Sequence, residues 1–536
     1  MKILTKPSVL RKFISRNWPW LVLLVVIIFT SIIRVRLLDV PLERDEGEYA
    51  YTAQLLLDGR APFDGAYSLK LPGTAIMYAG SFLAFGETVS GIRLGLLLVN
   101  VLTILLLFGI GNKLGGRLVA LIAGASYAIA SLSVSLLGFT ANTEHYAVLF
   151  FAAGIFVLLQ YRERPALHRA AVVGLCFGLA VVMKQPTAFL VLWSCCWMLW
   201  YARKQKPLGK AVAHASALGV AFVAPLVTLT WYVWANGQFS TMYFWVWTYA
   251  RAYSVIMPIN RVFLIFFTSG AGIFIALGSI IILATLGIFS IIQTRKLHER
   301  LFITTWVIAS LAAISVGFYF RDHYFILGLP ALCVSAGFGA YAILHLLQQH
   351  NSPRTAKRGT AALLVLVLLW IPINEAKYWF CVSTTEYSVH AYPHQNFPVY
   401  RTFAATLEQF IRAGDRVAII GSEPELLFYT GLRSVTGYLY TYPFFELQPY
   451  RTRMFIQFIE EIETAKPELL VVVEHNYSLG EKPWHNDNPL WPWLKQYQQS
   501  YTLLTAQEFP VDSEVPSGSR VATHEQQKIS VYRRSQ

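Results

Sequence analysis

The sequence predicts a polytopic α-helical membrane protein with about eleven spans, followed by a soluble C-terminal α/β domain. Of its 536 residues, 55% are hydrophobic and only 14% are charged, whereas soluble domains are about one quarter charged. Apolar stretches long enough to cross the hydrocarbon core of a bilayer recur from Leu21 to Trp370 and then stop. Residues 379–536 have ordinary polarity and suffice for one soluble domain.

The predicted spans follow these apolar stretches, and the two short ones beside MKQPT (183–187) can instead form one re-entrant unit. The first span follows a basic N-terminus that includes Lys2 and Lys6, and no small-residue cleavage site comes after it, so we interpret it as an uncleaved anchor. The spans lie near 19–39, 91–112, 118–139, 145–160, 170–183, 186–201, 211–234, 262–292, 302–320, 324–348 and 360–375.

The distribution of basic residues predicts which side of the membrane each loop occupies. With the N-terminus in the cytoplasm, the inner segments hold roughly three times as many Lys and Arg as the outer loops, which is the positive-inside bias. Because the span count is odd, the C-terminal domain and the first external loop (40–90) then lie together outside the cytoplasm. We expect a multi-pass protein of the inner (plasma) membrane, with its active site on that side. The net charge of +14 lies mostly in short loops and not in a basic stripe with aromatics, so nucleic acid is not an expected partner.

Two domains are expected, residues 1–378 and 379–536. In the second, helical patterns near 398–414, 422–431 and 449–465 alternate with strand patterns at 415–421 and 468–473, which is typical of an α/β domain. No GxGxxG follows the first strand, so no nucleotide site is predicted. Ser422 and Glu425 have the spacing of a helix capping box. The five cysteines lack CxxC or Cys/His spacing, so neither a disulfide framework nor a zinc site is expected.

The first external loop is longer than a connection requires, which is typical of functional loops. Crowded carboxylates at a low-dielectric interface raise one another's pKa and can act as general bases, although a solvated acidic loop is the alternative. Apolar residues at helical spacing between 46 and 57 predict a helix that lies along the membrane surface and ends at Gly59. The loop opens with LERDEGEYAY (42–51), whose ionisable residues include Glu43, Arg44, Asp45, Glu46 and Glu48.

Lys70 precedes Leu71-Pro72-Gly73 where the chain returns toward the membrane. A lysine fixed at that depth suits a lipid-linked phosphate, and a snorkelling lysine is the alternative. Ionisable residues at span ends are costly unless they are paired or used. Those predicted on the same outer side are Glu144 and His145 in TANTEHY (140–146), Lys184 in KQPT, and Arg321, Asp322 and His323 in FRDHYFILGLP.

Several segments of the sequence resemble those of a known protein family. RDEGEYAYTAQLLLDGRAPF, LKLPG, FGETVSGIRLG, VMKQPT and RDHYFILGLP resemble segments of the PMT-like (family 39 type) glycosyltransferases of the GT-C superfold. That group includes protein O-mannosyltransferases and bacterial aminoarabinose transferases that act on lipid A. The resemblance covers about residues 19–375, and the C-terminal domain does not match the MIR domain of a mannosyltransferase.

The resemblance implies a role for several residues. Asp45 matches the acidic residue that acts as base after the first span, and Glu46 completes an acidic pair with it. Lys70 resembles the lysine that binds the donor phosphate, and Lys184 and Arg321 are expected to assist it. The remaining candidates, expected to bind substrate, are Glu144, His145, His323 and Tyr324.

The implied activity is transfer of a sugar from a polyprenyl-phosphate donor to an extracytoplasmic acceptor, with inversion at the anomeric carbon. The acceptor can be a lipid, a glycan or a protein, and membrane lipids are further partners. No cofactor is required, although the carboxylates of Asp45 and Glu46 leave room for a divalent ion. The rival interpretation is a transporter or flippase of lipid-linked glycans, but internal repeats and midplane charges typical of transporters are missing. A membrane scaffold with an outer sensory domain fits the acidic loop less well.

Overall fold

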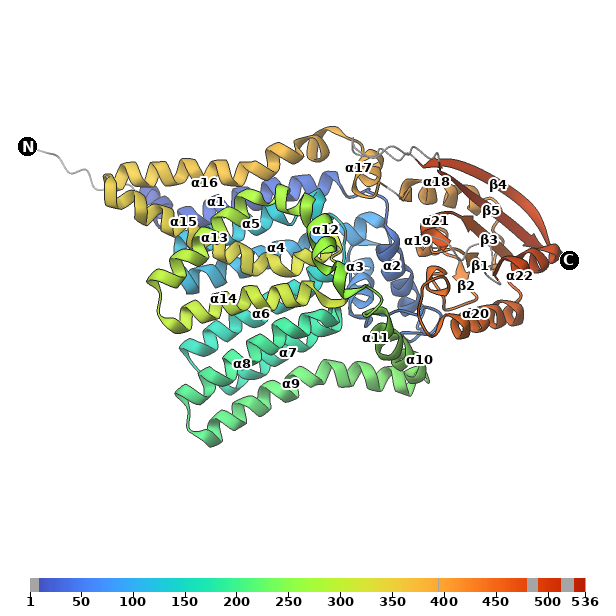
Figure 1. Cartoon of the computed structure of the whole chain (residues 1–536), viewed down its shortest axis with the longest axis horizontal. Helices are drawn as coiled ribbons and strands as arrows, with labels where there is room; N and C mark the ends of the chain where they lie inside the picture. The colour runs from blue at the N-terminus through green and yellow to red at the C-terminus, as the bar shows by residue number, and fades with distance from the viewer. Residues whose placement is uncertain (1–8, 394, 480–489, 512–524, 536) are drawn as a thin grey trace, which may run out of the picture. The chain divides into compact units, whose positions relative to one another are not determined.

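The computed structural model describes residues 9–393, 395–479, 490–511 and 525–535. The chain divides into two compact units, each assembled from three segments, and Figure 1 labels their elements. Lys2 and Lys6, part of the predicted basic N-terminus, lie outside the described residues. Unit 1 comprises Met1–Leu38, Arg93–Leu226 and Asn260–Cys381, and unit 2 comprises Asp39–Ile92, Val227–Ile259 and Val382–Gln536.

The described part of unit 1 is helical. Short helical turns, among them η1 (Val134–Leu136), η2 (Gln185–Thr187), η6 (Asp322–Gly328) and η7 (Lys377–Cys381), join its long helices. The long helices, two of which extend into unit 2, are α1 (Val9–Arg36), α4 (Val89–Gly115), α5 (Arg117–Ala130), α6 (Thr143–Glu163), α7 (Leu167–Met183), α8 (Ala188–Gln205), α9 (Leu208–Ala235), α12 (Val262–Ala276), α13 (Gly278–Thr294), α14 (Leu297–Ile314), α15 (Leu329–His350) and α16 (Pro353–Ala376).

Among the described residues, eight helices are long and apolar enough to cross a membrane. Further apolar helices are shorter, and they include α5, α7 and α13. The predicted polytopic helical architecture is therefore confirmed. The eight candidates are Asn17–Arg36, Val89–Gly115, Thr143–Glu163, Leu208–Ala235, Ile259–Ala276, Leu297–Ile314, Asp322–His350 and Pro353–Cys381.

Small residues let the helices of unit 1 approach closely. A Cβ added at Gly287 of α13 would lie 1.9 Å from the carbonyl oxygen of Ser335, and one at Gly339 of α15 would lie 1.9 Å from that of Leu283. Helices in lipid associate mainly by such close packing, since apolar surface gains nothing from leaving lipid. The α13–α15 contact is thus set by glycines on both helices.

Two predicted spans are wrong in their extent. The predicted span 262–292 is divided between α12 and α13, because the backbone leaves helical geometry at Leu277, just before Gly278. The predicted span 118–139 ends at Ala130, and the chain then continues as a buried, largely non-helical segment. Arg34 donates hydrogen bonds to the carbonyl oxygens of Ser131 (2.7 Å) and Gly138 (3.1 Å). Non-helical backbone at membrane depth requires such protein partners.

Unit 2 is built on a five-stranded sheet of order β2-β1-β3-β5-β4. The strands β2, β1 and β3 are parallel to one another, whereas β5 runs antiparallel to both β3 and β4. The predicted soluble α/β domain is confirmed, and the two antiparallel strands are an addition that the sequence analysis missed. The strands are β1 (Arg416–Ile420), β2 (Arg433–Ser434), β3 (Leu469–Glu474), β4 (Tyr501–Val511) and β5 (Glu525–Arg534).

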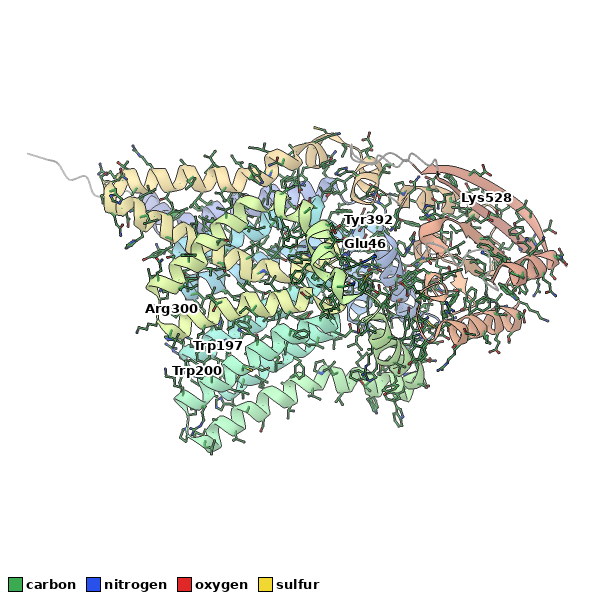
Figure 2. The ribbon with its side chains drawn as sticks, viewed as in Figure 1. Glu46, Trp197, Trp200, Arg300, Tyr392 and Lys528 are labelled. Carbon is green, nitrogen blue, oxygen red and sulfur yellow. The ribbon has the colours of Figure 1, made fainter. Side chains whose placement is uncertain are left out.

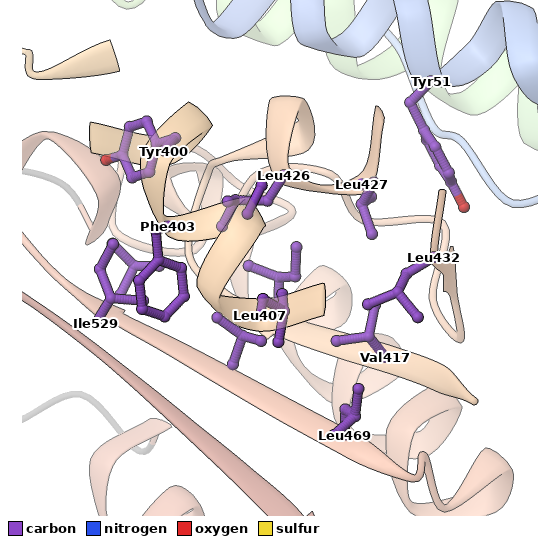
Figure 3. Packing of buried hydrophobic residues seen from close by; sticks show 14 of the residues in the cluster. Tyr51, Tyr400, Phe403, Leu407, Val417, Leu426, Leu427, Leu432, Leu469 and Ile529 are labelled. Carbon is purple, nitrogen blue, oxygen red and sulfur yellow. The ribbon is translucent and has the colours of Figure 1, made fainter. Parts of the chain in front are cut away.

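Both faces of this sheet are covered, as alternate residues of β1 and β3 require. On one face Val417 and Leu469 pack with Phe403 and Leu407 of α18 (Phe397–Glu408), and Figure 3 shows this cluster. On the other face Ala418 and Leu470 pack with residues of α20 (Arg451–Ala465) and of η3 (Phe244–Tyr249). Tyr51, from the first external loop, belongs to the first cluster.

The first external loop contains α2 (Arg44–Leu57) and α3 (Gly73–Phe85). The predicted helix is confirmed, and its placement along the membrane surface stays a prediction. Tyr51 and Gln54 are buried while Leu57 is exposed, because α2 packs against both α3 and α19 (Pro424–Thr430). A Cβ at Gly47 would lie only 2.5 Å from the backbone nitrogen of Glu425.

Within unit 2, the first external loop therefore packs with residues that follow Cys381. The division at residues 378 and 379 stays a prediction. The predicted capping box is wrong, because α19 has Glu423 at its N-cap position and no side-chain capping bond. The hydroxyl of Ser422 instead donates to the carbonyl oxygen of Ser478 (2.6 Å). The tight turn after β1 is thus tied to the short helix α21 (Asn476–Leu479), which follows β3.

Candidate active site

One face of α2 presents three polar side chains. Asp45, Glu48 and Tyr49 are three and four residues apart, a spacing that places side chains together on a helix. The N-cap residue Glu43 fixes the first turn by accepting hydrogen bonds from the backbone nitrogens of Asp45 (3.0 Å) and Glu46 (3.2 Å). The local sequence thereby sets where the carboxylates of Asp45 and Glu48 lie.

The amino group of Lys70 lies against this face. Its Nζ is 3.1 Å from Asp45 Oδ2 and 3.4 Å from Glu48 Oε2. It also donates a 2.6 Å hydrogen bond to the hydroxyl of Tyr49. The backbone nitrogen of Lys70 donates to Ser68 Oγ (3.1 Å), which fixes the chain just before α3 begins. The structure thus brings together Asp45 and Lys70, two of the residues that the sequence singled out.

Glu48 is bound from three sides. The hydroxyl of Tyr440 donates to Glu48 Oε2 (2.6 Å), the hydroxyl of Ser68 donates to Oε1, and Lys70 pairs with Oε2. Tyr440 follows β2 in unit 2, so the segment after Cys381 supplies part of the arrangement. We call the six residues Asp45, Glu48, Tyr49, Ser68, Lys70 and Tyr440 the Lys70 cluster.

Charge and burial keep the Lys70 cluster in one protonation pattern. Burial favours a neutral amine, but the carboxylates of Asp45 and Glu48 outweigh burial and raise the pKa of Lys70 well above its ordinary value. Burial also raises the pKa of both phenols, Tyr49 and Tyr440. At neutral pH the ammonium is therefore charged and the phenols remain hydrogen-bond donors.

The two carboxylates differ in exposure. The side chain of Asp45 is 29% exposed, whereas that of Glu48 is 4% exposed. A carboxylate with an exposed edge can reach an incoming hydroxyl, whereas a buried carboxylate held by three partners is suited to holding its neighbours in place. The structure therefore separates a reactive candidate, Asp45, from a positioning candidate, Glu48.

A small pocket with a water-accessible volume of about 20 Å³ opens beside the cluster. One wall contains Phe63, whose φ of 70° is unusual for an aromatic residue and whose ring packs against Val233 and Met242. The lining combines charge, hydroxyl groups and apolar surface, which is typical of ligand pockets. Its residues include Glu48, Tyr49, Thr52, Pro62, Phe63, Ser68, Lys70 and Pro72.

Glu46, predicted to complete an acidic pair with Asp45, is fully buried. Its Oε2 accepts a 3.4 Å hydrogen bond from the backbone nitrogen of Glu43, and this bond completes a capping box. The structure therefore gives Glu46 a part in holding the first turn of α2. A direct catalytic role for Glu46 stays a prediction.

A second layer of buried charges lies behind α2. Arg44 Nη2 is 3.9 Å from Glu423 Oε1, and Glu423 also accepts a hydrogen bond from the hydroxyl of Tyr400 (3.2 Å). Neither carboxyl oxygen of Glu425 has a hydrogen-bond partner among the described residues. Burial and the charge of Glu423 raise the pKa of Glu425 well above its ordinary value. Glu425 is therefore driven toward its neutral form where α19 packs on α2.

Unit 1 contains a separate cluster of predicted residues, Glu144, Lys184, His323 and Tyr324, which we call the Glu144 cluster. Glu144 lies in the first turn of α6 and Lys184 caps the C-terminus of α7, so each charge suits its helix dipole. Their side chains form a salt bridge, and Glu144 is fully buried. His323 Nε2 is 3.8 Å from Glu144 Oε1, and Lys184 Nζ lies 4.1 Å from the centre of the Tyr324 ring.

Two further residues that were predicted to bind substrate or phosphate are not members of the Glu144 cluster. His145 is fully buried, and neither ring nitrogen has a hydrogen-bond partner among the described residues. Arg321 is exposed, with its guanidinium 5.7 Å from the centre of the Tyr319 ring. Roles in substrate binding for His145 and in phosphate binding for Arg321 stay predictions.

Sequence reasoning missed the parts played by Glu48 and Tyr440. Glu48 was named in the acidic run without a role, although its spacing of three residues from Asp45 is the helical signal that could have placed it. Tyr440 carried no signal, because 392 residues separate it from Glu48. In the part of the chain that the structure describes, no group of three or more His, Cys, Asp or Glu side chains could hold a metal ion.

Residues 70–231 match the model of the dolichyl-phosphate-mannose-protein mannosyltransferase family. The match begins at Lys70 and includes Glu144, His145 and Lys184. No curated protein sequence matches the chain significantly.

Solved structures extend the likeness to almost the whole chain. ArnT from Cupriavidus metallidurans bound to undecaprenyl phosphate is similar with a TM-score of 0.58 and 14% identity, over 96% of this chain and 98% of that one. The archaeal oligosaccharyltransferase AglB from Archaeoglobus fulgidus, in complex with an inhibitory peptide and a dolichol-phosphate, gives a TM-score of 0.53 and 11% identity, over 92% and 73%. The fold matched includes both the helical part and the soluble domain, and the chain is an integral membrane protein with the GT-C fold. Its resemblance to the PMT-like glycosyltransferases of the GT-C superfold is confirmed by the family match over residues 70–231 and by this fold.

Proposed function

We propose that this protein is a membrane glycosyltransferase that takes its sugar, a hexose or a pentose, from a polyprenyl-phosphate donor. The observation that carries the proposal is the Lys70 cluster, in which a charged amine and an accessible carboxylate lie 3.1 Å apart beside a pocket. The family match, which begins at Lys70, and the fold shared with proteins solved with undecaprenyl phosphate and dolichol-phosphate support the same activity.

In this proposal the donor phosphate binds Lys70. The ammonium is a compact positive charge with three donors, and its pKa is raised by its carboxylate neighbours, so it is charged at any physiological pH. Two carboxylates, those of Asp45 and Glu48, outnumber this charge. An arriving phosphate would therefore compete with the more exposed carboxylate, that of Asp45.

Displacement of Asp45 from Lys70 would prepare the base. While it is paired with an ammonium, a carboxylate is a weaker proton acceptor. Donor binding would replace that pair with a phosphate pair and leave the carboxylate of Asp45 free to accept a proton. Glu48 would keep Lys70 in place throughout, because its hydrogen bonds to Ser68 and Tyr440 hold it from the other side.

The reaction then balances as a single displacement. The acceptor hydroxyl attacks the anomeric carbon from the face opposite the phosphate, and its proton passes to Asp45. The bond between the anomeric carbon and the phosphate oxygen breaks, and the oxygen keeps the electron pair as polyprenyl phosphate leaves on Lys70. This displacement inverts the configuration at the anomeric carbon.

The Glu144 cluster is proposed to bind substrate within unit 1. Lys184, now paired with Glu144, and Arg321 are proposed to bind phosphate, while His323 and Tyr324 would offer a hydrogen-bonding ring and an aromatic surface to a sugar. The acceptor is an extracytoplasmic lipid, glycan or protein.

The proposed orientation places unit 2 outside the cytoplasm at the inner (plasma) membrane. Thr464, exposed at the end of α20, gives a site for testing this in a background without the five native cysteines. Thr464→Cys should react with a membrane-impermeant maleimide in intact cells. Protection in intact cells together with labelling after lysis would reverse the orientation.

Transfer should be measured with the purified full chain in liposomes that contain a radiolabelled polyprenyl-phosphate sugar and an acceptor extract. Label should move from the lipid donor to a second molecule in the wild type and not in Asp45→Asn. Passage of the labelled lipid across the bilayer without transfer would instead identify a flippase. Loss of transfer on chelation, restored by a divalent ion, would add a metal to the mechanism.

A further inference from the structure

A second pocket lies in unit 1, among the ends of several helices. It lies between the C-terminal ends of α4, α6 and α13, the start of α14, and α15, and its water-accessible volume is about 20 Å³. No residue of the Lys70 cluster or the Glu144 cluster lines it. Its residues are Leu114, Arg162, Ile291, Arg295, Glu299, Phe302, Ile303 and Phe338.

The length of α6 gives the depth of this pocket. Glu144 lies in the first turn of α6 and Arg162 in the last, 18 residues later. At 1.5 Å per residue they are about 27 Å apart along the axis, close to the roughly 30 Å of a bilayer's hydrocarbon core. If Glu144 lies at one headgroup layer, Arg162 lies at the other.

Neighbouring side chains agree with this depth. On α13 an exposed apolar stripe runs through Ile282, Leu286, Phe289 and Ile292 and stops one turn before Arg295. Trp197, Trp200 and Arg300 lie at the same end of the unit 1 helices in Figure 2, and Trp side chains concentrate at membrane interfaces. The Trp197 ring is 5.3 Å from that of Phe302 in the pocket wall.

The pocket carries one surplus positive charge. Arg295 Nη1 is 3.6 Å from Glu299 Oε2, and its guanidinium lies 5.5 Å from the centre of the Phe338 ring. Arg162 is half-buried and makes no salt bridge among the described residues. The opposite side is apolar, formed by Leu114, Ile291 and Ile303 among others. Two guanidiniums beside an apolar wall at this depth match a phosphate attached to a hydrocarbon chain.

We propose that this pocket binds the headgroup phosphate of an anionic phospholipid, held by Arg162 and Arg295, with the first carbons of the acyl chains on the apolar wall. The site is separate from the proposed transfer reaction and does not depend on it. Because Glu299 competes with the lipid for Arg295, removal of its charge should strengthen binding.

Binding should be measured by titrating the purified full chain in detergent with dihexanoyl phosphatidylglycerol and following its thermal unfolding. Matched titrations use dihexanoyl phosphatidylcholine, which carries no net charge, and inorganic phosphate, which has no apolar chain. The wild type should be stabilised by phosphatidylglycerol, and at least about tenfold higher concentrations of phosphatidylcholine or inorganic phosphate should be needed. Equal potency of inorganic phosphate would overturn the assignment to a lipid.

Three variants test the residues. Arg162→Gln should weaken phosphatidylglycerol binding about tenfold or more, since a charge-assisted hydrogen bond is lost. Glu299→Gln should tighten binding, a change of sign that misfolding cannot produce. Arg164→Gln is the matched control, because Arg164 is exposed two residues further along and does not line the pocket. Equal weakening of binding by Arg162→Gln and Arg164→Gln would show nonspecific electrostatic attraction of the lipid to the protein surface. That result would refute the site.

Discussion

The Lys70 cluster of unit 2 and the Glu144 cluster of unit 1 both join a lysine to a carboxylate at the start of a helix, but they differ in exposure and in charge balance. Lys70 meets two carboxylates and is 27% exposed at a pocket edge. Lys184 meets the fully buried Glu144 and is 11% exposed. A partly exposed pair with surplus negative charge can exchange a partner at little cost, because water stabilises the charge that is released. Breaking a buried pair instead leaves a buried charge with neither water nor a partner to stabilise it. The same residue types therefore exchange a partner for substrate more easily in unit 2 than in unit 1, where substrate would have to break a buried pair.

The largest effect is expected at Asp45. Asp45→Asn keeps the shape and removes the base, so transfer should fall by about 10²–10⁴-fold, while insertion and donor binding remain. Transfer kinetics and donor binding should be measured on the same purified sample. Glu46→Gln, which alters the capping box, should lower stability more than turnover. Equal and complete loss in both variants would indicate a shared metal, and full activity of Asp45→Asn would remove it as the base.

Breaking the buried pair should mainly affect stability. Lys184→Met leaves the carboxylate of Glu144 buried without its cation, and this should cost about 3–5 kcal/mol of unfolding free energy. Thermal unfolding in detergent measures the effect. The double variant Glu144→Gln with Lys184→Met should recover much of the loss. If the double variant is stable and fully active, the cluster has no role in substrate binding.

Lys70→Ala should weaken donor binding more than acceptor binding. Losing a charged hydrogen bond to phosphate is worth about 1.5–3 kcal/mol, or about ten- to a hundredfold in affinity. Binding of a polyprenyl phosphate can be followed by native mass spectrometry, with Lys70→Arg as the variant that preserves the charge. Normal donor binding with failed transfer would reassign Lys70 to the acceptor.

Tyr440→Phe should produce a smaller loss at the same cluster. The variant removes the 2.6 Å hydrogen bond to Glu48, so Glu48 should hold Lys70 less firmly and donor affinity should fall several-fold, about 1 kcal/mol. Tyr438→Phe is the matched control, since the hydroxyl of Tyr438 donates to Gln457 instead. A drop in turnover alone, with donor affinity preserved, would argue against positioning of Lys70 by Tyr440.

The smallest expected effect is on the pH dependence of stability, and it involves Glu425, which lies behind α2. Glu425 has a folded pKa raised well above its ordinary value by burial and Glu423. Its contribution to stability is therefore complete below the unfolded pKa of about 4.3 and is lost as pH rises through the folded pKa. Glu425→Gln cannot ionise, so the stability of unit 2 should depend less on pH and exceed that of wild type at pH 8. An unchanged pH dependence would show that the pKa of Glu425 is the same in the folded and unfolded states.

Much of the fold could be predicted because apolar periodicity and turn residues are local signals. The helix within residues 46–57, the strand at 415–421 and the alternation of helices and strands after it all follow from patterns a few residues long. The errors arose where tertiary partners override such patterns. The chain leaves the helix after Ala130 because Arg34, almost a hundred residues earlier, satisfies the freed carbonyls. The antiparallel pair β4 and β5 also needs a partner strand far away in sequence.

The sequence by itself determined that this chain belongs in a membrane, and it singled out Asp45 and Lys70, because composition, charge bias and short motifs do not depend on distant contacts. Only the tertiary structure decided that Lys70 lies between Asp45 and Glu48 and that Tyr440 completes the cluster. The physical reason is that hydrogen bonds and ion pairs depend on ångström-scale distances. Such distances between residues far apart in sequence are fixed only when α2, α3 and the segment after β2 pack together.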